Sequence, residues 1–560
     1  MSDGPVAVRT TGLDLVRHHP RTRRARWVDT LLRLLVAGAA GGVYLLAFAP
    51  HDWWAAALLA MALVAWAGLG AGLWWGAAVG AVFGLAFWLG HIGWLTAYLG
   101  PVPWLALALA MTAFSALGVA LAGFVTRRQL ARQTHPALVA AAWAVIWTGR
   151  EVTFSRLPYG GFAWGSVAAS QADAPTVGLS SWLGLSGLTL AVVLACTLPV
   201  TWLLARRPLH RPAVMGVILL VAALITPAWG AVAPATGTLR VAAVQGNADA
   251  GLFSNAEPGE ILRNHLDAAR SIMHDDFDVM VWPENAVDVD VLRSTQVDQA
   301  ITDFVDDMGR PLVFGSVTQR GDDVYNTVLL WLPSGWRTGD VADPEVAGSS
   351  GDAGQPAQVY DKRHPVPFAE YMPDRWLFHP LAPDLVDLVP RGFTFGTRSG
   401  VFDIPLDAAS ASGEGDATVP AGVLICFETS DTDLVHDVVG GGAQILLAPT
   451  NNADFGRTPE SAQQLQIARV NAVATGRSLV NISTVSSSAL VAEDGTVMDT
   501  LPDFTAGTMI ADLPLQSGRA PSWWTGPIVQ WGSAVATVLM VIATALARRN
   551  ERRGARASDR

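Results

Sequence analysis

The sequence has few charged residues for its length, and it has almost no lysine. Only 15% of its 560 residues are charged, whereas 51% are hydrophobic. Among the 37 lysines and arginines a single one is lysine, Lys362. So low a charge content excludes an ordinary soluble protein of this length and indicates membrane spans. The net charge of -11 also excludes a generally basic nucleic-acid binder.

Charge is missing altogether from long stretches of the chain. From Trp53 to Thr126, 74 consecutive residues contain no Asp, Glu, Lys or Arg, although one span needs only about 20 apolar residues. Glycines and prolines at 68–72 and 100–103 divide this run into three spans. In all we predict eight spans, at 30–49, 53–69, 73–97, 103–125, 136–150, 177–204, 212–231 and 525–547.

The arginines predict how these spans are oriented, because short cytoplasmic loops carry excess positive charge. With eight spans, all four arginine clusters fall on one side of the membrane. Both termini are then cytoplasmic. A cleaved signal peptide is the alternative for the first span, but seven later spans make cleavage unnecessary. The clusters are Arg21, Arg23, Arg24 and Arg26; Arg127, Arg128 and Arg132; Arg206, Arg207 and Arg211; and Arg548, Arg549, Arg552 and Arg553.

The chain therefore divides into five predicted segments. An Arg-rich cytoplasmic segment at 1–29 precedes a membrane domain at 30–236, and an extracytoplasmic domain follows at 237–518. The eighth span at 519–547 leads into an Arg-rich cytoplasmic tail at 548–560. Nearly 280 residues between spans seven and eight are enough for a substantial core.

Short β-branched runs alternate with helical patterns in this extracytoplasmic segment, which predicts an α/β sandwich. Stretches 334–358 and 407–418 are rich in Gly, Ser, Ala and acidic residues, and we expect both to be surface loop insertions. The predicted strands are 239–245, 279–283, 311–317, 326–332, 421–427, 443–449 and 478–484, and the predicted helices are 258–274, 297–308 and 458–475.

Cysteine is nearly absent as well. Cys196 lies in the sixth predicted span and is expected to be a small packing residue. Cys426 ends the run AGVLICF in the outer domain, too far from Cys196 to pair with it. A cysteine in an apolar strand is usually a core residue. However, chemistry in open α/β sheets gathers at the carboxyl ends of strands, which makes Cys426 a candidate nucleophile.

Two further candidates stand at predicted strand ends. Glu284 ends VMVWPE, where a carboxyl without a neighbouring cation could have a raised pKa suited to proton transfer; a helix cap or a solvated acid is the alternative. Lys362 lies in YDKRHPVPF. In a chain that otherwise uses arginine, a lysine suggests a site that needs a compact ammonium, although a chance surface lysine is the alternative.

Together these motifs resemble the Glu-Lys-Cys triad of the carbon-nitrogen hydrolase (nitrilase) superfamily, in that order. With the membrane spans added, nearly the whole chain resembles the bacterial apolipoprotein N-acyltransferase family. The segment KRHPVPFAEYMP is similar to that family's lysine segment, with Ala369 in place of its usual glycine. NNADFG at 451–456 is similar to another family segment, except that the family's tryptophan is missing.

The resemblance implies a role for each matched residue. Cys426 would be the nucleophile, Glu284 the general base and Lys362 the cation facing the oxyanion, helped by the backbone N–H of Phe427. Glu370 would hold Lys362 or help to receive the proton of the acceptor amine, with an ordinary salt bridge as the alternative. The remaining matched positions, expected to support the site or position substrate, are Glu428 in CFE, Asn326 in YNT and Tyr371 in EYMP.

The resemblance also implies the reaction. A phospholipid would donate its sn-1 acyl chain to Cys426, and the α-amine of a diacylglyceryl-cysteine at a lipoprotein's N-terminus would receive it. A membrane-anchored amidase using water, and a transporter or scaffold whose outer domain only binds, are the alternatives. We expect a monomer in the bacterial cytoplasmic membrane that contacts the lipid bilayer. Without HExxH, CxxC or clustered His and Asp, we expect neither a metal nor a cofactor.

A hydrophobic loop follows the lysine segment. Stretch 371–395 carries Trp376, Phe378, Leu388 and Phe393. We predict that these side chains are exposed on a loop that dips into the lipid and gates access to the site. Packing of the same side chains into the core is the alternative.

Overall fold

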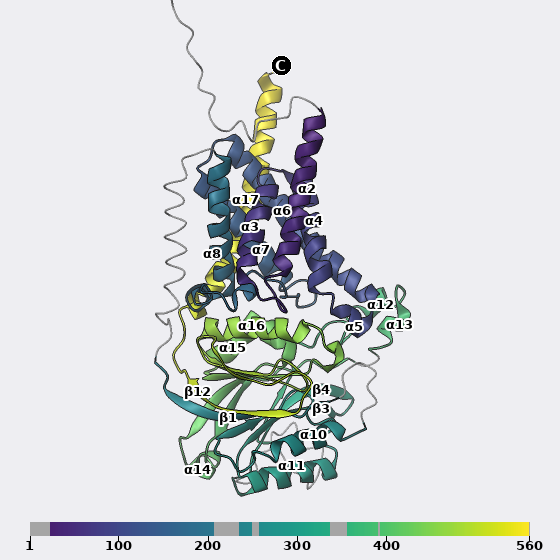
Figure 1. Cartoon of the computed structure of the whole chain (residues 1–560), viewed down its shortest axis with the longest axis vertical. Helices are drawn as coiled ribbons and strands as arrows, with labels where there is room; N and C mark the ends of the chain where they lie inside the picture. The colour runs from purple at the N-terminus through teal and green to yellow at the C-terminus, as the bar shows by residue number, and fades with distance from the viewer. Residues whose placement is uncertain (1–22, 206–233, 249–256, 337–355, 390–391, 559–560) are drawn as a thin grey trace, which may run out of the picture.

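The computed structural model describes residues 23–205, 234–248, 257–336, 356–389 and 392–558, and it has two parts stacked along its long axis (Figure 1). One part is a helix bundle built from residues 23–205 and the last helix of the chain. The other is an α/β domain at the opposite end. The predicted seventh span, 212–231, and most of the segment 1–29 lie outside the described residues.

The bundle forms where the sequence is almost free of charge. Five of its described helices, α2, α4, α6, α8 and α17, are long and apolar enough to cross a membrane, while α3 is apolar but has only 15 residues. The predicted span at 73–97 is two helices in the structure, because the chain turns between α4 and α5. The helices are α2 (Arg23–Leu45), α3 (Trp54–Gly68), α4 (Leu73–His91), α5 (Leu95–Leu99), α6 (Pro101–Ala131), α7 (Pro136–Phe154), α8 (Leu179–Leu204) and α17 (Ser522–Ser558).

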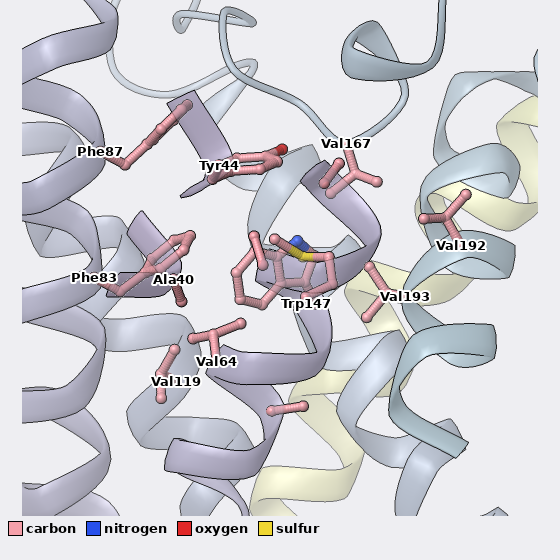
Figure 2. Close-up of a cluster of buried hydrophobic side chains, with 14 of the residues drawn as sticks. Ala40, Tyr44, Val64, Phe83, Phe87, Val119, Trp147, Val167, Val192 and Val193 are labelled. Atoms are coloured by element: carbon pink, nitrogen blue, oxygen red, sulfur yellow. The ribbon is translucent and has the colours of Figure 1, made fainter. Parts of the chain in front are cut away.

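Aromatic and small apolar side chains fill the core of this bundle (Figure 2). The ring centroids of Tyr44 in α2 and Phe87 in α4 lie 4.5 Å apart. Those of Phe83 in α4 and Trp147 in α7 lie 5.7 Å apart, with the rings edge to face. Because lipid is as apolar as these side chains, close packing rather than burial from water holds such helices together.

Two six-stranded sheets pack face to face in the α/β domain. Their strand orders are β12-β1-β2-β3-β4-β5 and β11-β10-β9-β8-β7-β6. In each sheet three central strands run parallel, β1-β2-β3 and β7-β8-β9. The strands are β1 (Gly237–Gln245), β2 (Val279–Val281), β3 (Leu312–Arg320), β4 (Asp323–Trp331), β5 (Gln358–Asp361), β6 (Val401–Pro405), β7 (Thr418–Val423), β8 (Ile445–Thr450), β9 (Ser478–Ser483), β10 (Ala489–Val491), β11 (Val497–Thr500) and β12 (Gly507–Leu515).

Helices cover both outer faces, which gives the four layers of an αββα sandwich. Helices α10 (Glu260–Ala269) and α11 (Thr295–Met308) cover the first sheet, on the side away from the bundle (Figure 1). Helices α15 (Thr432–Gly440) and α16 (Glu460–Thr475) cover the second sheet and lie next to the bundle. The α-helical membrane domain and the α/β sandwich predicted from the sequence are both confirmed.

Two local predictions in the α/β domain are wrong. The stretch 407–418 is not an irregular loop throughout, because Asp407 accepts a hydrogen bond from Ser410 N (2.7 Å) and caps the short helix α14 (Ala408–Ala411). The strand predicted at 421–427 ends earlier, since β7 stops at Val423 and the chain turns before Cys426. Most of the stretch 334–358, from 337 to 355, lies outside the described residues.

Candidate active site

Glu284 follows β2 and rests against the neighbouring strand β3. Gly315 of β3 makes this possible, because a Cβ at that position would lie 2.6 Å from the Cα of Glu284. Oε1 of Glu284 accepts hydrogen bonds from Asn326 Nδ2 (2.6 Å) and Lys362 Nζ (3.2 Å). Its Oε2 is buried and has no hydrogen-bond partner among the described residues. Burial raises the pKa of Glu284, which the Lys362 ammonium only partly opposes, so this carboxyl is suited to exchange protons.

Lys362 follows β5 and is fixed by backbone hydrogen bonds on both sides. Its N–H donates to Asn326 O (2.8 Å), and its carbonyl accepts from Gly396 N (2.9 Å). The side chain is 1% exposed, and Nζ donates to Glu284 Oε1 and Glu370 Oε1. Burial alone would lower the pKa of Lys362, but the two carboxylates outweigh it and the pKa is raised. The site therefore keeps a compact, permanent cation.

Glu370 uses both of its carboxylate oxygens inside the cluster. Oε1 accepts from Lys362 Nζ (2.9 Å) and Asn326 Nδ2 (3.0 Å), and Oε2 accepts from the backbone N–H of Val366 (2.6 Å). Asn326 thus bridges Glu284 and Glu370, and Lys362 lies between the same two acids. With every oxygen engaged, Glu370 is placed to hold the ammonium of Lys362.

Cys426 begins the 3₁₀ turn η4 (Cys426–Ser430), just beyond the end of β7. Its φ of +52° is in the left-handed region, which residues other than glycine rarely adopt and which often marks functional sites. Burial and the Glu284 carboxylate raise the pKa of this half-buried thiol, while Lys362 lowers it. The thiol is therefore protonated at rest, and it lies close enough to Glu284 and Lys362 for their charges to act on it.

Glu428 is completely buried and ties the segment that carries Lys362 to the turn that carries Cys426. Its oxygens accept from the N–H groups of Arg363 (2.7 Å) and His364 (3.1 Å), from Ile425 N (2.8 Å) and from the hydroxyl of Tyr360 (3.0 Å). Burial raises the pKa of Glu428, although these donors favour its anion. The contacts assign Glu428 to positioning rather than to direct chemistry.

Phe427 links the candidate site to the helix bundle. Its ring stacks on Trp164 with centroids 5.7 Å apart and planes 8° from parallel. Trp164 stacks in turn on Phe162 at 5.3 Å and 11°. Both partners belong to the chain between α7 and α8, so a loop of the bundle reaches the residue next to Cys426.

Helix α16 docks on the same side of the bundle through glutamines. Gln463 Oε1 accepts from Trp94 Nε1 (3.0 Å), and Gln466 Nε2 donates to Asp52 Oδ1 (2.6 Å). Gln466 also accepts from the backbone of Ala49 (3.2 Å). The candidate site therefore lies at the junction of the bundle and the α/β domain.

The hydrophobic loop predicted at 371–395 is only partly exposed. Trp376 is 76% and Leu388 is 47% exposed, as predicted. Phe378 and Phe393 are half-buried, so their predicted exposure is wrong; the ring of Phe378 lies against those of Phe368 and Tyr159, outside the loop. Tyr371 is also half-buried, with its ring 4.9 Å from another aromatic ring of the segment. The loop carries the short helices α12 (Arg375–Phe378) and α13 (Pro383–Val386) and contacts the bundle through Tyr159, which donates to Asp374 Oδ2 (2.8 Å).

The sequence analysis missed one acidic residue close to Cys426. Glu460, the first residue of α16, is 4% exposed and is electrostatically coupled to both Glu284 and Cys426. In the sequence it looks like any acid in the first turn of a helix. Its hydrogen-bond partner Asn452 falls in the NNADFG segment, and the resemblance of that segment to the family was the one sequence feature that could have pointed to Glu460.

A cavity of about 160 Å³ lies between the bundle and the α/β domain. Glu151 and Thr189 line it from the bundle, and His364 and Asp431 line it from the other side. His364 Nδ1 and Asp431 Oδ2 lie 2.5 Å apart, which raises the pKa of the imidazole and lowers that of the carboxyl. No cluster of His, Cys, Asp or Glu suited to a metal ion occurs in the described part of the chain.

The two facing sheets, with acid, amine and thiol gathered beyond their strand ends, define a nitrilase-type α/β domain attached to a bundle of apolar helices. Residues 240–520, half of the chain, match the carbon-nitrogen hydrolase family, and the chain belongs to that family. Residues 40–198 match the apolipoprotein N-acyltransferase N-terminal domain. The resemblance drawn from the motifs is confirmed in both parts.

Curated relatives carry one name across much of the chain. The protein is 28% identical to the apolipoprotein N-acyltransferase of Azotobacter vinelandii over 559 residues, 95% of this chain and 97% of that one. It is 26% identical to the enzyme of that name from Shewanella oneidensis over 69% of this chain and 68% of that one. The match to the Mycolicibacterium smegmatis enzyme is 30% identical but spans 55% of this chain and 48% of that one. These relatives and the apolar helices identify a multi-pass bacterial membrane protein.

Proposed function

We propose that the protein transfers a fatty acyl chain from a phospholipid to the α-amine of the N-terminal S-diacylglyceryl-cysteine of an apolipoprotein, through a thioester on Cys426. The observation that carries this proposal is where the Glu284, Lys362 and Cys426 cluster lies, at the junction of an apolar helix bundle with a carbon-nitrogen hydrolase domain. Lipid substrates held in a membrane can reach such a junction. The name shared by relatives that cover nearly the whole chain supports the same reaction.

In the first half-reaction Cys426 attacks the carbonyl carbon of the lipid ester. Its proton passes to Oε2 of Glu284, which has no competing partner among the described residues. The Lys362 ammonium and the N–H of Phe427 stabilise the tetrahedral oxyanion, a contribution that is large in a site shielded from water. The ester C–O bond then breaks, Glu284 returns the proton to the departing glycerol oxygen, and lysophospholipid leaves.

In the second half-reaction the amine of the acceptor attacks the thioester carbonyl. Glu284 takes a proton from the attacking nitrogen and gives it to the sulfur as the C–S bond breaks, so the amide forms and Cys426 is regenerated. Glu370 and Asn326 keep Lys362 and Glu284 in place throughout, and Glu428 holds the Lys362 segment against the turn at Cys426. Tyr371, which is half-buried, helps to position the substrate in this proposal.

Access from the membrane is the second part of the proposal. Loop 371–395 exposes Trp376 and Leu388 beside the bundle, which suits a segment that inserts into lipid and gates the site. The arginine clusters support an α/β domain outside the cytoplasm, because short cytoplasmic loops carry excess positive charge. One chain holds all of the side chains that the reaction uses, in keeping with a monomer.

A direct test is to mix the purified enzyme with phospholipid and a diacylglyceryl peptide and to follow the acyl group by mass spectrometry. We expect an acyl adduct on Cys426 that disappears as the peptide amine becomes acylated, and no adduct in Cys426→Ala. The competing function, an amidase of the same superfamily, uses water as acceptor. Release of ammonia from small amides without lipid would favour the amidase and contradict acyl transfer.

A further inference from the structure

Glu460 is a buried acid near Cys426 that the proposed mechanism leaves without a role. It begins α16, the helix that docks on the bundle. Among the described residues its one hydrogen-bond donor is Asn452 Nδ2, at 2.8 Å, and no cation pairs with it there. The same amide group also donates to Gln464 Oε1 (2.7 Å). Nε2 of Gln464 is buried and has no acceptor within the described part of the chain.

The other acids around Cys426 already have hydrogen-bond partners or a proton to carry. Both oxygens of Glu370 are bonded to Lys362, Asn326 and backbone, and both oxygens of Glu428 accept from donors that fix the chain. Glu284 has one spare oxygen, which each half-reaction uses for a single proton. Glu460 is therefore the remaining carboxyl that can hold a second proton.

The proposed second half-reaction needs a second group that can accept a proton. A peptide α-amine has a pKa of about 8, so most of it arrives at neutral pH as an ammonium. The ammonium must lose one proton before its nitrogen can attack and a second one during the attack. Glu284 accounts for the second proton, which returns to the sulfur of Cys426, and the first is left over.

We propose that Glu460 receives the ammonium of the acceptor and accepts its first proton, so that a neutral amine attacks the thioester on Cys426. One N–H bond breaks and one O–H bond forms on Glu460. The amine nitrogen then bonds to the carbonyl carbon and the C–S bond breaks. After the amide product leaves, Glu460 returns its proton to solvent. This role rests on the proposed acyl transfer and adds the recognition of the acceptor to it.

The electrostatics of the site suit this exchange. Burial and, to a smaller extent, the Glu284 carboxylate raise the pKa of Glu460 to about 8, although the hydrogen bond from Asn452 favours the anion. The titratable groups that face it are Glu284 and Cys426, and Lys362 and Glu370 complete the cluster around that thiol. Two groups with nearly equal pKa values exchange a proton at little cost in free energy.

The test compares the full-length enzyme with Glu460→Gln, which keeps the shape and an acceptor for Asn452. The two half-reactions are measured separately, as adduct formation on Cys426 and as single-turnover transfer from the isolated acyl-enzyme to a diacylglyceryl peptide between pH 6 and pH 9.5. We expect adduct formation within about threefold of wild type, which also reports correct folding, and transfer at pH 7 slower by about tenfold or more.

The pH dependence of transfer separates proton acceptance from a structural role. Wild-type kcat/KM for the acceptor should rise and then fall around pH 8, since Glu460 must be ionised to accept a proton and the acceptor must still carry its ammonium to give one. In Glu460→Gln the falling limb should vanish, so the deficit closes by about pH 9. Hydroxylamine, which is neutral at pH 7, should cleave the acyl-enzyme of both proteins at the same rate.

Two controls keep the outcomes apart. Glu260→Gln removes the matching first-residue acid of α10, on the far side of the domain, and should change neither half-reaction. If wild type forms no adduct on Cys426, the acyl transfer itself is wrong. If the adduct forms but Glu460→Gln transfers with the wild-type rate and pH profile, or loses transfer equally at every pH and with hydroxylamine, the role of Glu460 is overturned.

Discussion

The helix bundle and the α/β domain each contain a buried ionic cluster, and the two clusters differ in how completely the oxygens of their acids are hydrogen-bonded. In the bundle, Arg150 and Glu151 pair at 3.3 Å. The oxygens of Glu151 also accept from Trp147 Nε1 and Thr189 Oγ1, both at 3.0 Å. The guanidinium of Arg150 lies over the rings of Trp147 and Phe154. Charge in this cluster is balanced one to one, and its acid has no oxygen to spare.

In the α/β domain two carboxylates share one ammonium. Lys362 bonds to both Glu284 and Glu370, yet Oε2 of Glu284 has no partner among the described residues, and the thiol of Cys426 lies in the same cluster. An acid whose oxygens are all bonded holds its neighbours in place, whereas an acid with a spare oxygen and a shifted pKa can move a proton. The comparison thus separates a cluster that holds helices together from one that carries out chemistry.

The strongest way to break the comparison is to change the single lysine. Lys362→Arg keeps the charge, but a planar guanidinium cannot occupy the same point between Glu284 and Glu370. We expect adduct formation on Cys426 to fall by about a thousandfold, as when an oxyanion donor is lost. The measurement is the rate of acylation by mass spectrometry.

The neighbouring arginine offers a reciprocal control. Arg363→Lys exchanges the same two residue types at a half-buried side chain that pairs with Asp437 at 3.3 Å. It should acylate at the wild-type rate. Comparable rates for Lys362→Arg and wild type would mean that any cation serves at position 362 and that the oxyanion role is wrong.

The bundle cluster should behave in the opposite way. Glu151→Gln leaves the guanidinium of Arg150 buried without its counter-ion, which typically costs about 3 kcal/mol or more of stability. We expect a clearly lower unfolding temperature in detergent, while the molecules that remain folded acylate Cys426 nearly as fast as wild type. The exposed acid Glu551 gives a control, because Glu551→Gln should leave the unfolding temperature unchanged. Loss of acylation at unchanged stability would place Glu151 in the chemistry instead.

The access loop, residues 371–395, belongs to neither cluster and tests the role of exposed apolar side chains. Trp376 is mostly exposed, so Trp376→Ser should slow turnover on phospholipid vesicles by about tenfold and leave the unfolding temperature unchanged. Phe378 packs 5.0 Å from Phe368, and Phe378→Ser should lower stability as well. Equal losses of turnover and stability in Trp376→Ser would contradict a gating role.

Much of the fold could be predicted because burial in layers leaves a clear pattern. The runs that became β1, β3, β8 and β9 are apolar and bounded by polar residues. Lys362 stood out by composition alone, since arginine fills every other basic position. The short strands β5, β6, β10 and β11 were missed because each has five residues or fewer, and pairing rather than local pattern decides such segments. The longer edge strand β12 was missed as well.

The parts of the site that the sequence concealed depend on tertiary contacts. AGVLICF reads as one continuous strand, and nothing local announces the left-handed turn at Cys426. Gln463 and Gln466 look like exposed helix residues until the loops of the bundle supply their partners. In the sequence Glu460 looks like an ordinary acid in the first turn of a helix. Its pKa is raised by burial in the folded protein, and that burial leaves no signature in the sequence.

The smallest expected effect concerns Glu428, the acid of the α/β domain whose bonding most resembles that of Glu151. Tyr360→Phe removes one donor to Glu428, but three backbone N–H groups remain to hold the carboxylate. We expect a loss of about 1 kcal/mol in stability and an acylation rate only a few fold lower, since the hydroxyl positions the chain and exchanges no proton. Tyr159→Phe, which removes an exposed bond to Asp374, should change neither. If Tyr360→Phe abolished acylation at unchanged stability, this part of the site would be chemical rather than structural, and the number of bonds a buried acid makes would not predict its role.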